Sequence, residues 1–128
     1  METADADFWM DERAEAAGRL RLGLVGELDI ASAGALKERL RVLAARGEPV
    51  VLDLGRLQFI DSSGLRELVR AVSDARRDHW SLELATTLSP QVRQIIDLLE
   101  LRELFWPAAE PAAPSATTAE PARPTERA

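Results

Sequence analysis

The sequence predicts an α/β fold, with one mixed β-sheet of about four to five strands and helices packed mainly on one of its faces. Short segments in which every second residue is apolar alternate with segments in which apolar residues recur every three or four positions. Strand and helix units that alternate in this way are typical of helices packed on a sheet. A length of 128 residues is enough for one domain with one core.

The first half of the chain predicts a strand and a helix after an acidic leader. The acidic leader, residues 1–15, contains one apolar triplet, Phe8, Trp9 and Met10, which fits either an edge strand or loose packing over the core. Leucines alternate from position 20 to 24, as in a half-buried strand that we expect to close at Gly26. Residues 33–46 have the apolar stripe of an amphipathic helix, and Gly47 and Pro49 then stop it.

A buried central strand follows Pro49, because residues 50–54 form a short, nearly continuous apolar run. Residues 57–60 lead into a helix that we expect to begin at Gly64, with Ser63 as its N-cap. Residues 80–85 alternate as another strand, with Leu82 and Leu84 inward and Glu83 outward.

The last predicted helix starts at Ser89 and Pro90, since serine caps a helix and proline has no N–H to lose at its first position. Its buried stripe is expected to contain Val92, Ile95, Ile96 and Leu99. Five of the seven prolines fall within residues 107–128, so we expect a disordered tail there. The predicted organisation is a leader at 1–15, a domain at 16–106 and a tail at 107–128.

Composition argues against several classes of function. Residues 16–106 contain thirteen acidic and thirteen basic side chains, so they offer no basic face for nucleic acid. Cysteine is absent, and a single histidine, His79, leaves most metal sites and catalytic triads without their parts. No apolar run approaches the roughly 18 residues of a membrane span. We expect a cytoplasmic protein that does not insert into membranes.

Two turns carry the functional prediction. Gly-Glu-Leu-Asp occupies residues 26–29, and Phe-Ile-Asp-Ser-Ser-Gly-Leu occupies residues 59–65. Either motif alone could be an ordinary turn or helix cap. Taken together they are more specific, because Asp29 and Asp61 follow two strands at corresponding strand-to-helix turns. We therefore expect the two turns to meet on one rim of the sheet.

With both motifs intact, the sequence resembles the STAS family over about residues 20–106, and in particular its bacterial anti-sigma factor antagonists. Residues 101–105 look like the last short helix of that family. The resemblance implies a protein that binds an anti-sigma factor with serine kinase activity and releases a sigma factor. It also implies that phosphorylation of Ser62 switches the binding off, with Ser63 as the competing acceptor.

The same resemblance implies the residues that bind the partner: Glu27, Asp29, Asp61, Ser62, Ser63, Gly64 and Leu65. Gly64 is expected to leave the turn open to the kinase. No cofactor is expected, since the partner kinase would bind Mg-ATP. A monomer or weak homodimer is expected.

Two other hypotheses about the function remain open. The same fold could serve as the cytoplasmic STAS subunit that regulates a lipid-transporting ABC complex. An enzyme would need a base or a metal, and neither His79 nor the acids Glu27, Asp29 and Asp61 make a convincing site. The motifs of serine hydrolases and phosphate-binding loops are absent.

Overall fold

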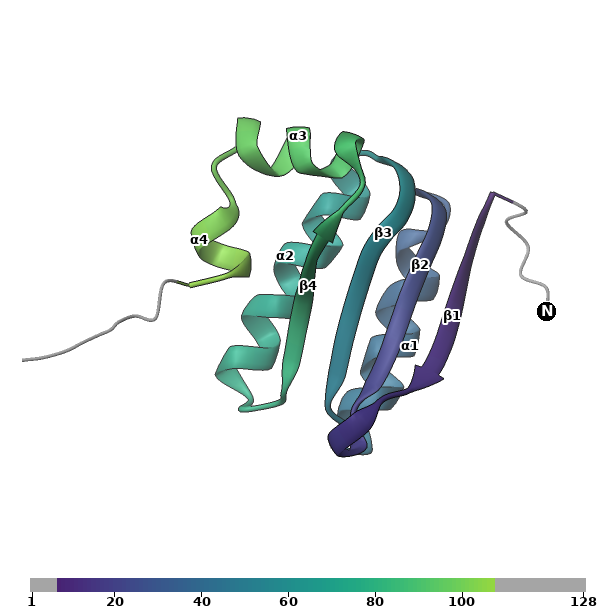
Figure 1. The fold of residues 1–128 in the computed structure, drawn as a ribbon, viewed down its shortest axis with the longest axis vertical. Helices are drawn as coiled ribbons and strands as arrows, with labels where there is room; N and C mark the ends of the chain where they lie inside the picture. Colours follow the sequence, from purple (N-terminus) through teal and green to yellow (C-terminus); the bar gives the residue numbers. More distant parts are fainter. Residues whose placement is uncertain (1–6, 108–128) are drawn as a thin grey trace, which may run out of the picture.

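The computed structural model describes residues 7–107. In this range the chain forms four strands and four α-helices, with a short 3₁₀ turn at Ala16–Gly18 (Figure 1). In chain order the elements are β1 Phe8–Ala14, β2 Leu20–Leu28, α1 Ala33–Ala45, β3 Val50–Ile60, α2 Ser62–Arg77, β4 Leu82–Leu88, α3 Pro90–Leu98 and α4 Arg102–Phe105. The first six residues of the leader and nearly all of the predicted tail, residues 1–6 and 108–128, lie outside the described residues.

The four strands form one mixed sheet in the order β1-β2-β3-β4. Strands β2, β3 and β4 are parallel, and β1 is antiparallel to β2. The predicted mixed sheet is therefore confirmed, and β3 is an inner strand, as its apolar run indicated. Because the carboxyl ends of parallel strands meet at one edge, the turns that follow β2 and β3 lie at the same end of the sheet.

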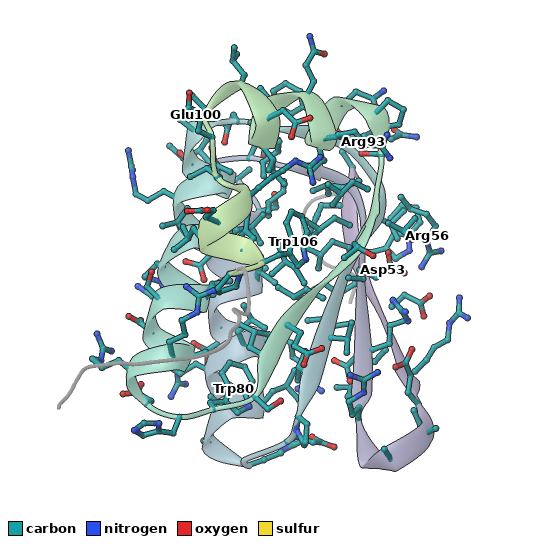
Figure 2. The ribbon with its side chains drawn as sticks, turned by 60° about the vertical axis from the view of Figure 1, so that its left-hand side comes forward. Asp53, Arg56, Trp80, Arg93, Glu100 and Trp106 are labelled. Carbon is teal, nitrogen blue, oxygen red and sulfur yellow. The ribbon has the colours of Figure 1, made fainter. Side chains whose placement is uncertain are left out.

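The core lies between the sheet and one layer of helices. Leucines of β2 and β3 face leucines of α1 and α2, and all are fully buried: Leu22, Leu24, Leu28, Leu52, Leu54, Leu36, Leu43 and Leu68. Figure 1 shows α1 and α2 side by side behind the sheet, with α3 across its upper end. On the opposite face the sheet carries ion pairs, such as Arg21 with Asp53 and Arg56 with Asp11. Figure 2 labels Asp53 and Arg56 on β3. The two long helices thus cover one face, as predicted.

The apolar triplet near the start of the chain lies in β1, an edge strand. Phe8 is almost completely buried in the core, and Met10 packs against it. Glu12 pairs with Arg39 of α1, which links the edge strand to the helical layer. Of the two interpretations left open for this segment, the structure shows the edge strand.

The prediction that the second strand closes at Gly26 is wrong, because β2 continues to Leu28. Gly26 has a φ of +98°, and a Cβ built there would be 1.9 Å from the carbonyl oxygen of Asp7. Glycine therefore lets the start of β1 pass close to β2 without ending the strand. Similarly, residues 50–60 form one strand where two segments were expected, and β4 runs on to Leu88.

The third helix begins as predicted. Ser89 accepts a hydrogen bond from the backbone N–H of Val92 at 3.4 Å, and Pro90 occupies the first turn. Val92 and Ile96 are buried, but the prediction for Leu99 is wrong. This residue follows the last turn of α3 and is 52% exposed, because the chain there turns away toward α4.

Candidate functional site

The two motif turns lie beside each other at the carboxyl ends of β2 and β3. Leu28 and Ile60 are partners in the parallel register, and the backbone N–H of Asp61 donates to the carbonyl of Leu28 at 3.2 Å. Asp29 and Asp61 are the next residues of their strands. The predicted meeting of the two turns is confirmed. We call residues 26–32 and 60–65 the rim.

The Asp29 turn is held by a buried serine. Asp29 Oδ1 accepts hydrogen bonds from the N–H groups of Ala31 and Ser32 at 3.0 and 3.2 Å. Ser32 Oγ accepts from the N–H of Asp29 at 2.9 Å and donates to the carbonyl of Glu27 at 2.9 Å. Ser32 is only 1% exposed. The sequence reasoning missed Ser32, although a serine three residues after an aspartate at a helix start is a recognisable turn signal.

Asp61 is the N-cap of α2. Its backbone is extended, and its Oδ1 accepts a hydrogen bond from the N–H of Gly64 at 2.9 Å. Helical backbone therefore begins at Ser62. The prediction that Ser63 caps a helix beginning at Gly64 is wrong, because the backbone is already helical at Ser62 and the extended residue before the helix is Asp61.

Ser62 and Ser63 occupy the first two helical positions of α2. Ser62 is exposed, whereas Ser63 is half-buried. Within residues 7–107 neither hydroxyl forms a hydrogen bond. The Oγ of Ser62 is therefore free to be presented to another molecule.

Gly64 has a packing role. It is buried, and a Cβ built on it would be 2.4 Å from the carbonyl oxygen of Leu28. The absence of a side chain lets α2 approach the end of β2, and it does not open the turn to a kinase as the sequence suggested. Leu65 is half-buried and packs against the core. Glu27 is half-buried and lies opposite Phe59 in the register.

Two exposed apolar side chains lie in or next to the rim. Among the described residues, the large exposed hydrophobic side chains are Trp9, Ile30, Phe59, Leu98 and Leu99. Ile30 directly follows Asp29 and is 78% exposed, and Phe59 lies two residues before Asp61. Trp9 pairs with Val25 near the end of β2, and α3 lies across the same end of the sheet (Figure 1). Apolar groups gathered around a polar centre are typical of a surface that binds another protein.

Other candidate chemistry is not assembled in the described part of the chain. His79 is exposed just beyond the end of α2, with a φ of +59°. Within residues 7–107 no group of three or more His, Asp or Glu side chains could hold a metal ion. The helices in that range are too short or too polar for any to cross a membrane.

Comparison with known protein families identifies the fold. A family model described as "Mlab, STAS domain" matches residues 11–106. The chain belongs to the STAS domain family. The match begins within β1 and ends just after α4, so the matched region includes the second half of the edge strand as well as both motif turns.

Two curated relatives are similar to most of this STAS domain. BtrV of Bordetella bronchiseptica, assigned as an anti-sigma factor antagonist, is 35% identical over 89 residues, which are 69% of this chain and 76% of BtrV. The anti-sigma-B factor antagonist of Bacillus subtilis is 28% identical over 86 residues, which are 67% of this chain and 78% of that protein.

Solved structures share the fold. An anti-sigma factor antagonist from Mycobacterium paratuberculosis superposes with a TM-score of 0.67 at 23% identity, over 81% of this chain and 88% of that one. The Bacillus cell fate determinant SpoIIAA, solved in a phosphorylated form, superposes with a TM-score of 0.58 at 16% identity, over 88% and 92% of the two chains.

Proposed function

We propose that this STAS domain is an anti-sigma factor antagonist. In the unphosphorylated state, the rim binds an anti-sigma factor that is also a serine kinase, and the sigma factor is released in the cytoplasm. Phosphorylation of Ser62 ends this binding. The chain acts by binding and catalyses no reaction itself. The observation that carries the proposal is the exposed Ser62 hydroxyl, which forms no hydrogen bond within residues 7–107 and lies beside the turn of Asp61 and Asp29, in a family member whose curated relatives are named as antagonists.

The exposures of the two serines favour Ser62 as the acceptor. A kinase must bring the γ-phosphate of ATP onto the serine Oγ, which requires a hydroxyl at the surface. Ser62 is exposed and Ser63 is half-buried in the first turn of α2. The alternative acceptor is therefore less accessible without partial opening of the helix.

Charge explains why phosphorylation would release the partner. A phosphate adds nearly two negative charges beside Asp61, with Asp29 and Glu27 on the neighbouring turn. A surface that accepts this acidic rim would meet added repulsion and bulk. The positive end of the α2 helix dipole offsets part of the electrostatic cost of placing the phosphate next to these carboxylates. We therefore expect a local switch without refolding.

Binding to purified anti-sigma factors of the native host tests the proposal. We expect Ser62→Asp to raise the dissociation constant at least about tenfold, because the new charge lies at the contact. Ser73→Asp is the matched control, since Ser73 is an exposed serine farther along α2, and it should bind like the parent. Equal binding by Ser62→Asp and the parent would contradict the switch.

Phosphorylation itself is tested with the same kinases and Mg-ATP. The tryptic peptide 57–66 contains both Ser62 and Ser63, so mass spectrometry of this peptide must be compared between the parent and Ser62→Ala. One phosphate on the parent peptide and none on Ser62→Ala supports the assignment. Isolation from the host in a stable complex with an ATPase and a membrane permease would instead select the transporter-subunit alternative.

A further inference from the structure

Arg66 lies one helical turn beyond Ser62 on α2. Residues four apart on a helix are neighbours on its surface, so the two side chains share one face. Both residues are exposed. An acidic group at the earlier position and a basic group at the later one is also the more favourable order along a helix.

Arg66 has no partner in the described chain. Most arginines within residues 7–107 form ion pairs with acidic side chains: Arg13, Arg19, Arg21, Arg39, Arg41, Arg56, Arg70, Arg77 and Arg102. Arg70, one turn farther along α2, is already bonded to Glu67 and Asp74. Arg66 forms no hydrogen bond or ion pair with any residue of that range.

We propose that, when Ser62 is phosphorylated, the guanidinium group of Arg66 forms an ion pair with the phosphate and thereby positions it. This inference rests on the proposed function, because it concerns the modified form of the same serine. The Asp61 carboxylate accepts a hydrogen bond from the N–H of Gly64, and its negative charge repels a phosphate on Ser62. Arg66 lies on the same face of α2 and is a cation without an ion-pair partner in the described part of the chain. Its planar guanidinium group matches two phosphate oxygens.

The pair has a consequence that can be measured. Phosphoserine loses its second proton near pH 6, and a neighbouring cation favours the doubly charged form. The Arg66 guanidinium therefore lowers the second pKa of the phosphate. Asp61 and, on the neighbouring turn, Asp29 and Glu27 raise this pKa, so Arg66 keeps the phosphate doubly charged to a lower pH than these carboxylates alone would allow.

The test uses the full chain with phosphoserine incorporated at position 62 during translation, followed by ³¹P NMR from pH 4 to pH 8. We expect the second pKa of the phosphate to be higher in Arg66→Gln than in the parent by about 0.3 unit, with Arg66→Lys in between. The difference should shrink in 1 M salt, because the pair is exposed to solvent.

Arg93→Gln is the matched control. Arg93 is an exposed arginine on α3 that also forms no ion pair in the described range, and Figure 2 shows it at the end of the molecule where α3 lies. The Arg93→Gln variant should leave the second pKa of the phosphate unchanged. The same pKa in the parent and in Arg66→Gln would overturn the proposal, as would equal shifts in Arg66→Gln and Arg93→Gln.

The outcome is separable from that of the proposed function, because translation installs the phosphate without any kinase. If no kinase modifies Ser62 but the titration shows the Arg66 effect, the proposed function fails and the ion pair stands. If a kinase modifies Ser62 but the titration shows no effect, only the ion pair fails.

Discussion

Gly64 lies where the first turn of α2 crosses the end of β2. The position is buried, and the carbonyl oxygen of Leu28 lies where any β-carbon would have to fit. Backbone atoms cannot move aside as a flexible side chain can. One missing methyl group therefore sets the distance between the two motif turns, and with it the spacing of Asp29 and Ser62.

Gly64→Ala should lower the free energy of unfolding by about 1 to 3 kcal/mol, because the added carbon forces α2 away from β2. Urea denaturation checks this. Gly34→Ala is the control, since a Cβ built at Gly34 in α1 meets nothing within 4 Å. It should leave stability unchanged or raise it by up to about 1 kcal/mol. Equal losses in the two variants would contradict the packing role of Gly64.

Among the site residues, those in the two motifs could be found from the sequence. Asp29, Asp61 and Ser62 lie on the rim, where the motif spacing put them. Ser32 could not be ranked in the same way, because its importance comes from hydrogen bonds to Glu27 and Asp29 that exist only when the turn is closed. The sequence also could not show that Asp61, and not the predicted Ser63, caps α2, because this depends on the backbone angles at the start of the helix.

At the scale of elements, β1 is joined to α1 by a charged pair. The Arg39 guanidinium donates to the Glu12 carboxylate, with Nη2 to Oε1 at 2.8 Å, and this bond lowers the pKa of Glu12. The carboxyl group is thus more acidic in the folded chain than in the unfolded one. Its contribution to stability is full above the unfolded pKa of about 4.3 and is lost as the pH falls through the folded value.

Arg39→Gln should therefore reduce the free energy of unfolding at pH 7, by less than about 1 kcal/mol because the pair is partly solvated. The gap between the variant and the parent should narrow below about pH 4, as Glu12 becomes protonated. Urea denaturation at pH 7 and pH 3.5 checks both statements. A gap that is equal at the two pH values would show that Arg39 acts through packing and not through the ion pair.

At the scale of the whole molecule, the rim and the exposed apolar side chains occupy one end of the sheet. The opposite end carries the 3₁₀ turn Ala16–Gly18 and the start of β4 (Figure 1). The helical layer has a separate surface, a hollow of about 370 Å³ between α1 and α2. Its lining includes Leu40, Ala71 and Trp80. The rim and the hollow are therefore two alternative sites for a partner.

Hydrogen exchange with and without a bound anti-sigma factor distinguishes them. We expect slower exchange in residues 26–32, 59–66 and 95–99, because these segments carry the rim and the exposed apolar groups. Residues 16–18 should be unaffected and serve as the internal control. Protection centred on Trp80 and the outer faces of α1 and α2 would instead identify the hollow as the docking surface.

The types and order of the elements could be read from the sequence, because strand and helix periodicities and helix caps are local properties of neighbouring residues. The meeting of Asp29 and Asp61 also followed, since two parallel strands end at one edge. Only the tertiary structure decided that β2 passes through Gly26, that Leu99 is exposed, and that Gly64 is required beneath Leu28. These features depend on contacts between residues far apart in the chain, whose distances are set by packing and leave no periodic trace in the sequence.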